Sequence, residues 1–208
     1  MNWLWISGWA VPPEWLAAQA KTAWPRASHV AVAPMDAARA LSRQKFDVLG
    51  GYSLGAMWLM RQAKAIPDDL PVVLLAPIFS FVAEHQRGGR VALAQLRLQR
   101  RRLRNDPAAA VTDFFQRAGL EELVNLPKAK PGHSRHPEEL EEELSWLEDW
   151  SISAVPKNWR GYVGGRDPLL EAPELKKIWP ELKIVARAGH APGPLMNAAK
   201  KTFPKGAA

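Results

Sequence analysis

Short apolar runs alternate with amphipathic stretches along most of the chain. The runs have the length of buried strands and are bounded by glycine, proline or polar residues; they cover residues 3–6, 29–32, 46–52, 71–75, 159–163 and 182–185. Helical patterns follow nearly every run, over residues 12–22, 37–42, 54–65, 172–178 and 194–201. Because parallel strands need a crossover between them, this alternation predicts a mostly parallel sheet of about six strands, covered by helices.

The alternation stops between residues 79 and 152, where no convincing strand occurs. Helices are expected there over residues 91–104, 107–118 and 137–150. We therefore predict one α/β domain, with residues 1–78 and 153–208 as its core and residues 79–152 as a helical lid insert over the carboxyl edge of the sheet.

The 208 residues are 47% hydrophobic, which is enough for one domain with a substantial core. The absence of cysteine excludes disulfides, thiolate metal sites and a cysteine nucleophile. Residues 1–7 are apolar but lack the basic leader of a signal sequence, and no apolar run approaches the roughly 20 residues that cross a bilayer. We expect a soluble cytoplasmic protein without membrane association, and its formal charge of +7 indicates an acidic partner or substrate.

Ser53 occupies the most informative position in the sequence. It is flanked by Gly51 and Gly55, directly after a predicted strand and directly before a predicted helix. Glycines at both flanks let the backbone pass through a tight strand-to-helix turn, which exposes the serine Oγ and points the helix N-terminus at it. This arrangement is typical of a nucleophilic serine. The alternative is a glycine-rich turn with an incidental serine.

A serine nucleophile needs a base, and the base needs an acid that orients it. Asp167 and His190 follow Ser53 in the chain order Ser, Asp, His that enzymes with this turn use. Each comes just after a predicted strand, so all three are expected at one edge of the sheet, where open α/β sheets hold their sites. A lone loop histidine is more often a surface residue, but the shared order and position favour His190 as the base and Asp167 as its partner. Glu171 and Glu174 are weaker candidates because they fall at or inside the next helix.

The oxyanion of an acyl-transfer intermediate needs two N–H donors. One is expected from Leu54, the residue after the nucleophile, and the other from residues 7–10, the loop after the first strand. We assign the second donor to the backbone N–H of Trp9, whose indole would also line the acyl pocket. The alternative is that Trp9 packs over the sheet edge, which leaves its N–H available as well.

Five stretches of the sequence resemble one group of enzymes. Residues 7–10 read Ser-Gly-Trp-Ala, residues 51–55 Gly-Tyr-Ser-Leu-Gly, residues 76–79 Ala-Pro-Ile-Phe and residues 189–192 Gly-His-Ala-Pro, while residues 103–115 look like a lid. The whole chain resembles the α/β-hydrolase superfamily. Within it, the chain is similar to the esterases that cleave the methyl ester of pimeloyl-acyl carrier protein in biotin synthesis. Ser7 stands where many of these relatives have histidine.

The resemblance implies a serine carboxylesterase that acts on this carrier-bound methyl ester through Ser53, His190 and Asp167, without a cofactor. A general short-acyl esterase or thioesterase is one alternative, and a non-catalytic binding protein of the same fold is another. His133 and His136 lie in a loop rich in proline and glycine and lack a third ligand at metal spacing, so no metal is expected.

Arg97, Arg101 and Arg104 are four and three residues apart, so they share one face of a predicted helix. This face would receive an acidic carrier protein or the phosphate of its pantetheine arm. The alternative is that these arginines pair with the acidic side chains of residues 138–149 or are solvated. Nucleic acid is not expected as a partner, because no part of the sequence resembles a nucleic-acid-binding motif. The sequence leaves the oligomeric state open.

Overall fold

The computed structural model describes residues 1–125 and 135–202 and contains a six-stranded sheet with the strand order β2-β1-β3-β4-β5-β6. Every pair of neighbouring strands is parallel. The strands are β1 (Asn2–Ile6), β2 (Ser28–Val32), β3 (Val48–Tyr52), β4 (Val72–Leu75), β5 (Arg160–Gly164) and β6 (Lys183–Val185). The parallel sheet of six strands that the sequence predicts is therefore confirmed.

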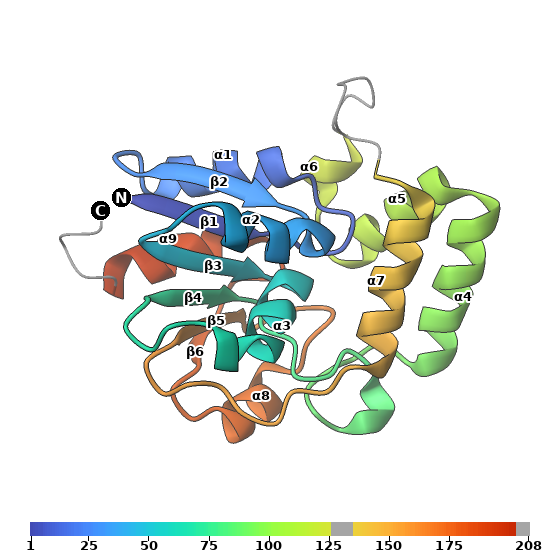
Figure 1. Ribbon diagram of the computed structural model, residues 1–208. Helices are drawn as coiled ribbons and strands as arrows, with labels where there is room; N and C mark the ends of the chain where they lie inside the picture. Colours follow the sequence, from blue (N-terminus) through green and yellow to red (C-terminus); the bar gives the residue numbers. More distant parts are fainter. Residues whose placement is uncertain (126–134, 203–208) are drawn as a thin grey trace.

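Helices cover both faces of the sheet (Figure 1). On one face α1 (Pro13–Ala23) and α9 (Pro192–Thr202) pack against each other, and α2 (Ala37–Arg43) and α3 (Leu54–Arg61) lie on the other face. The remaining core helix, α8 (Ala172–Ile178), connects β5 to β6. Strand order and helix placement follow from right-handed crossovers, which move the chain outward in both directions from β1.

The helix predicted over residues 54–65 is shorter in the structure. The α-helix ends at Arg61, and a 3-10 turn, η2 (Ala63–Ala65), follows it. The backbone N–H of Gln62 is shared between the carbonyl oxygens of Trp58 and Leu59, both at 3.0 Å, which tightens the last turn. This early end lets Ile66 become extended and bury its side chain ahead of Pro67.

In the described part of the insert, the α-helices are α4 (Leu93–Asn105), α5 (Pro107–Arg117), α6 (Glu121–Val124) and α7 (Pro137–Asp149). They lie beyond the carboxyl ends of the strands, the end toward which the arrows of β2, β3 and β4 point in Figure 1. Helix α7 packs against α4 on one side and against the turn η1 (Pro34–Asp36) on the other. The sequence pattern did not indicate the one-turn helix α6. The division into core and lid at residues 79 and 152 stays a prediction.

The centre of the sheet is buried on both faces. In β1 the side chains of Trp3, Leu4, Trp5 and Ile6 are all inaccessible to solvent, as expected for a parallel strand between two layers of helices. In the part of the chain that the structure describes, no helix is both long enough and apolar enough to cross a membrane.

Candidate active site

Ser53 forms a sharp turn between β3 and α3. Its backbone has φ +55° and ψ −116°, a conformation that non-glycine residues rarely adopt, and its N–H donates to the Leu75 carbonyl oxygen over 2.9 Å. The flanking glycines are required by close contacts. A Cβ on Gly51 would lie 2.7 Å from the Cα of Ala56, and a Cβ on Gly55 would overlap the carbonyl group of Ile6. The serine is thereby held at the N-terminus of α3, at the carboxyl edge of the sheet.

The structure brings Ser53, His190 and Asp167 together, although 137 residues separate the first two in sequence. Nε2 of His190 lies 3.0 Å from Oγ of Ser53, and Nδ1 of His190 lies 2.8 Å from Oδ2 of Asp167. The other carboxylate oxygen, Oδ1, accepts hydrogen bonds from the N–H groups of Leu169 at 2.8 Å and Leu170 at 3.1 Å. Both oxygens of Asp167 are therefore engaged, which fixes the carboxylate in the plane that faces the imidazole.

These three side chains are among the few buried polar groups of the described residues, with exposed fractions of 5% for Ser53, 2% for His190 and 1% for Asp167. Tyr52 adds a contact that sequence analysis missed: its hydroxyl donates to the carbonyl oxygen of His190 over 3.2 Å. Burial, reinforced by the charge of Asp167, raises the pKa of the Tyr52 phenol well above its usual value. The phenol thus remains a donor and holds the loop that carries the histidine.

The loop that carries Trp9 lies against Ser53, and Leu54 follows Ser53 directly in sequence. A Cβ on Gly8 would be 3.3 Å from the Cβ of Ser53, so the loop after β1 passes directly against Ser53. Within residues 1–125 and 135–202, the backbone N–H groups of Trp9 and Leu54 have no hydrogen-bond acceptor. The Trp9 indole packs against Leu140 and Phe114 of the insert, a partner that neither interpretation of the sequence named.

Backbone strain concentrates at the same edge. Three non-glycine residues with positive φ follow strands there: Ala10 at +58°, Ser53 at +55° and Ala76 at +48°. Strained conformations of this kind persist where the surrounding structure enforces them, and they cluster at functional sites. The carboxyl edge of the sheet is therefore the candidate site on geometric grounds alone.

No model of a known protein family matches the sequence, and no curated protein matches it. Solved structures do match it over nearly its whole length. An esterase from Rhodococcus sp. ECU1013 is 13% identical with a TM-score of 0.60, over 98% of this chain and 90% of that chain. An α/β fold family hydrolase from Bacillus anthracis str. Sterne is 12% identical with a TM-score of 0.55, over 97% of this chain and 89% of that one. The bottromycin epimerase, solved with bottromycin A2, is 12% identical with a TM-score of 0.66, over 100% of this chain and 90% of that one. The chain has the α/β-hydrolase fold.

In an α/β-hydrolase fold the site lies outside the carboxyl ends of the strands, which is where Ser53, His190 and Asp167 meet. The two weaker acid candidates point elsewhere, because Glu171 pairs with Arg90 at 3.1 Å and Glu174 pairs with Lys177 at 2.7 Å. Among the described residues, no three metal-binding side chains cluster; His133 lies outside this part of the chain.

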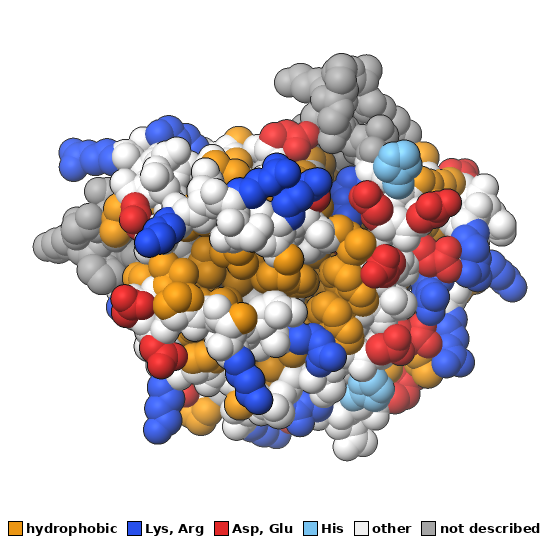
Figure 2. All heavy atoms as spheres, viewed as in Figure 1, with side chains coloured by type: hydrophobic (Ala, Val, Ile, Leu, Met, Phe, Trp, Pro, Cys, Tyr) orange, Lys and Arg blue, Asp and Glu red, His pale blue; other side chains and the backbone are white. Residues whose placement is uncertain are grey.

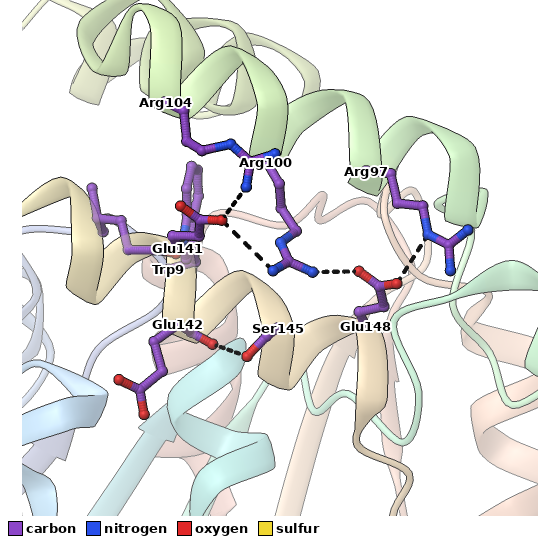
Figure 3. Close-up of polar contacts among 9 residues, drawn as sticks. Trp9, Arg97, Arg100, Arg104, Glu141, Glu142, Ser145 and Glu148 are labelled. Carbon is purple, nitrogen blue, oxygen red and sulfur yellow. Dashed lines mark hydrogen bonds and ion pairs between the residues drawn. The ribbon is translucent and has the colours of Figure 1, made fainter.

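The arginines of α4 mostly face acidic residues of α7 (Figure 3). Arg97 pairs with Glu148 at 3.1 Å, Arg104 pairs with Glu141 at 2.5 Å, and Arg100 lies between the two acids at 2.9 Å from Glu148 and 3.7 Å from Glu141. Burial alone would raise the pKa of the Glu148 carboxyl, but the hydrogen bonds and charges of Arg100 and Arg97 outweigh it and lower the pKa below its usual value. On the face seen in Figure 2, acidic side chains gather over α7 beside the basic side chains of α4.

Arg101 differs from its neighbours because it has no ion pair among the described residues. It lines a surface groove of about 640 Å³ whose walls also include Leu93, Ala94 and Leu98. Leu98 is 46% exposed, which is unusual for a large apolar side chain in this protein. Arg97 and Arg104 also line this groove, so the structure keeps the three predicted arginines on one surface while it pairs two of them internally.

Proposed function

We propose that the protein is a serine carboxylesterase in which Ser53 is the nucleophile, His190 the general base and Asp167 the residue that orients the base. One observation carries the proposal: hydrogen bonds link Oγ of Ser53 to Nε2 of His190 over 3.0 Å, and Nδ1 of His190 to the Asp167 carboxylate over 2.8 Å. A carboxylate beside Nδ1 keeps the imidazole proton on that nitrogen, so that Nε2 is free to accept the serine proton.

The reaction follows from this geometry. His190 accepts the Ser53 proton as Oγ attacks the ester carbonyl carbon. The carbonyl oxygen becomes an oxyanion, which accepts hydrogen bonds from the backbone N–H groups of Trp9 and Leu54. The tetrahedral intermediate collapses, and His190 returns the proton to the departing alcohol. Water, deprotonated by His190, then attacks the acyl-enzyme and releases the carboxylic acid and free Ser53.

The site supports hydrolysis more directly than the fold does. Two of the similar structures are an esterase and a hydrolase, but a third is an epimerase, so the same fold hosts other reactions. The hydrogen-bonded serine and histidine, with two N–H groups that lack acceptors beside them, are what a hydrolase of this fold requires.

For the substrate, we propose the methyl ester of pimeloyl-acyl carrier protein, which the sequence resemblance implies. The groove on α4 supports docking of an acidic carrier. Arg101 has no ion pair among the described residues, Leu98 offers an exposed apolar contact, and Arg97 is 65% exposed at its side chain even while it is paired. Charged and apolar groups side by side suit an acidic helix with apolar residues on its contact face.

A second candidate is a general short-acyl esterase or thioesterase that needs no carrier. It is favoured by the internal pairing of Arg97 and Arg104, since arginines that already neutralise Glu148 and Glu141 hold less charge for a partner.

Hydrolysis of the carrier-bound methyl ester by wild type and by Ser53→Ala tests the proposal, with p-nitrophenyl butyrate as the small ester. We expect turnover of both esters by wild type and a loss of at least about 10³-fold in Ser53→Ala. Ser80→Ala is the matched control, because Ser80 is also buried and also contacts a histidine, His85, at 2.7 Å, whereas the Asp167 carboxylate bonds to His190. Its activity should equal that of wild type.

Each outcome points to one function. Turnover of the small ester alone supports the second candidate. A folded wild type that turns over neither ester, and whose Ser53 does not react with a fluorophosphonate, indicates a binding protein of this fold. The docking surface is tested by Arg101→Ala against the charge-matched Arg43→Ala on α2. The first should lower kcat/KM for the carrier substrate about fivefold and leave the small ester unchanged.

A further inference from the structure

Trp9 connects the insert to the core. Its backbone belongs to the loop that passes against Ser53, whereas its indole is 1% exposed and lies beneath the insert helices. The indole Nε1–H donates to the carbonyl oxygen of Leu140 in α7 over 2.9 Å. The ring also makes an edge-on contact with Phe114 of α5, with centroids 4.7 Å apart and planes at 73°. The Trp9 side chain thus contacts two insert helices that are distant from it in sequence.

The Trp9 backbone lies in a turn that is closed by one hydrogen bond, from the Val11 N–H to the Gly8 carbonyl oxygen over 3.2 Å. Its N–H has no acceptor within the described residues, and the next residue, Ala10, is in the left-handed region at φ +58°. An oxyanion donor is effective only when its N–H is fixed before the charge develops. The buried indole therefore adds to this turn a second anchor, which ties the peptide that carries the proposed donor to the insert.

The anchor point is itself fixed. Leu140 precedes Glu141, which binds Arg104 and Arg100 of α4 on the outer side of α7 (Figure 3). On the inner side, Glu143 is fully buried and bound by Arg135 through two hydrogen bonds of 2.7 Å. Helix α7 is thus held on both sides, and the Leu140 carbonyl oxygen is held with it.

We propose that α7 positions the oxyanion donor through the Trp9 indole, which makes the indole a positioning group for the reaction and the insert a part of the catalytic apparatus. The inference rests on the proposed function and adds to it. It states that loss of the bond between Nε1 and the Leu140 carbonyl oxygen slows the chemical step more than it weakens substrate binding.

The test replaces Trp9 by Phe, which keeps an aromatic ring against Phe114 but removes the Nε1–H donor. Trp24→Phe is the matched control, because Trp24 is fully buried and its Nε1 has no hydrogen-bond partner in the described part of the chain. Both variants lose the same atoms from the core. We expect kcat for p-nitrophenyl butyrate to fall about tenfold or more in Trp9→Phe, with KM within about twofold, and to stay near wild type in Trp24→Phe.

A transition-state readout separates positioning from a packing effect. A trifluoromethyl ketone forms a tetrahedral adduct with a nucleophilic serine and needs the oxyanion donors, whereas the product butyrate does not. The inhibition constant of the trifluoromethyl ketone should rise in Trp9→Phe by about the same factor as kcat falls, and the inhibition constant of butyrate should not change. If Trp9→Phe does not fold, Phe114→Leu removes the edge-on contact and should lower kcat about threefold.

Equal kcat in Trp9→Phe and Trp24→Phe, with an active wild type, would overturn this inference and leave the proposed function intact. A wild type that neither turns over the ester nor reacts with the fluorophosphonate would overturn both.

Discussion

The indole N–H of Trp5 donates to Nδ1 of His29 over 3.2 Å. The Trp5 ring stacks on Trp3 with centroids 5.5 Å apart, and Trp24 lies tilted against Trp3 at 4.6 Å. Nε2 of His29 lies 2.9 Å from the Trp24 carbonyl oxygen, which can only accept. Both contacts are satisfied by a single form of the ring, the neutral tautomer with its proton on Nε2. The aromatic cluster therefore depends on an uncharged histidine.

Folding stability should fall in mild acid because of His29. Burial lowers the pKa of His29, and the charges of Lys21 and the N-terminus lower it further. The hydrogen bond to the Trp24 carbonyl oxygen acts in the opposite direction and raises it. Because the pKa of His29 is lower in the folded than in the unfolded state, the neutral ring stabilises the folded protein. This stabilisation is complete above the unfolded pKa of about 6.5, and it is lost as the pH falls from there through the folded pKa. We expect the free energy of unfolding in urea to decline from pH 7.5 to pH 5. His29→Asn keeps an acceptor for Trp5 without titrating, so its decline should be smaller, and equal declines would contradict the prediction.

Asp167→Asn should abolish most activity without unfolding the protein. The asparagine oxygen still accepts from Leu169 and Leu170, so the loop keeps its hydrogen bonds. The amide NH₂ then faces Nδ1 of His190, which must become an acceptor, and the ring proton moves to Nε2. In that tautomer His190 cannot take the Ser53 proton, and we expect kcat to fall by about 10⁴. Steady-state kinetics and the urea midpoint measure the two effects separately; a drop below about tenfold would mean that Asp167 does not orient the base.

Local signals determine the parts of this protein that could be predicted from sequence. Apolar runs fix the six strands, and Gly51 and Gly55 mark the turn at Ser53 because any Cβ there meets backbone atoms. Asp167 and His190 could be placed at the same edge because carboxyl ends of parallel strands coincide, whatever the helices do.

Long-range contacts determine what could not be predicted. The Trp9 indole meets Leu140, which is 131 residues away, and nothing near Trp9 in sequence indicates this partner. Spacing alone makes Arg97, Arg101 and Arg104 equivalent. The structure distinguishes these arginines because α7 lies along only one side of α4. Arg100 is about 100° around the helix from Arg101 and reaches the acidic side chains of α7, whereas Arg101 does not.

The ion pairs between α4 and α7 should couple the two helices measurably. Arg100 and Glu148 have side-chain exposed fractions of 28% and 13%, so they are shielded from solvent more than most surface pairs. A double-mutant cycle with Arg100→Gln and Glu148→Gln should give a coupling free energy of about 1 kcal/mol that shrinks in high salt. Since the pKa of Glu148 is lowered, this stabilisation should persist above the unfolded pKa of the carboxyl and disappear as the pH falls through the folded one.

Glu142→Gln is the control for that cycle. Glu142 is exposed on α7, and its carboxylate points away from α4 in Figure 3. It should change the free energy of unfolding by less than about 0.5 kcal/mol and show no coupling to Arg100. Coupling of similar size at Glu142 would show that a general charge effect, and not the pair, holds α7 to α4.

Removing Arg135 should destabilise the protein far more than removing an exposed arginine. Glu143 is inaccessible to solvent, and this burial raises the pKa of its carboxyl. The hydrogen bonds and charge of Arg135, together with a backbone hydrogen bond from Met35, offset only part of that rise. Arg135→Ala leaves this carboxylate buried without its cation, which typically costs about 3–5 kcal/mol at neutral pH. The loss should shrink below the raised folded pKa, because a protonated Glu143 carries no charge. Arg102→Ala, which breaks the exposed pair with Asp113, should cost less than about 1 kcal/mol.

The double variant Arg135→Met with Glu143→Leu decides whether the pair stabilises α7 or only avoids a penalty. If burial of the charges is as unfavourable as the raised pKa indicates, replacing both by apolar side chains should restore stability to within about 1 kcal/mol of wild type, in urea unfolding at pH 7. Such a variant would keep α7 attached by packing alone, and its kcat would then show whether the inner anchor of the helix matters to Trp9. A double variant as unstable as Arg135→Ala would mean that the two 2.7 Å hydrogen bonds contribute net stability themselves.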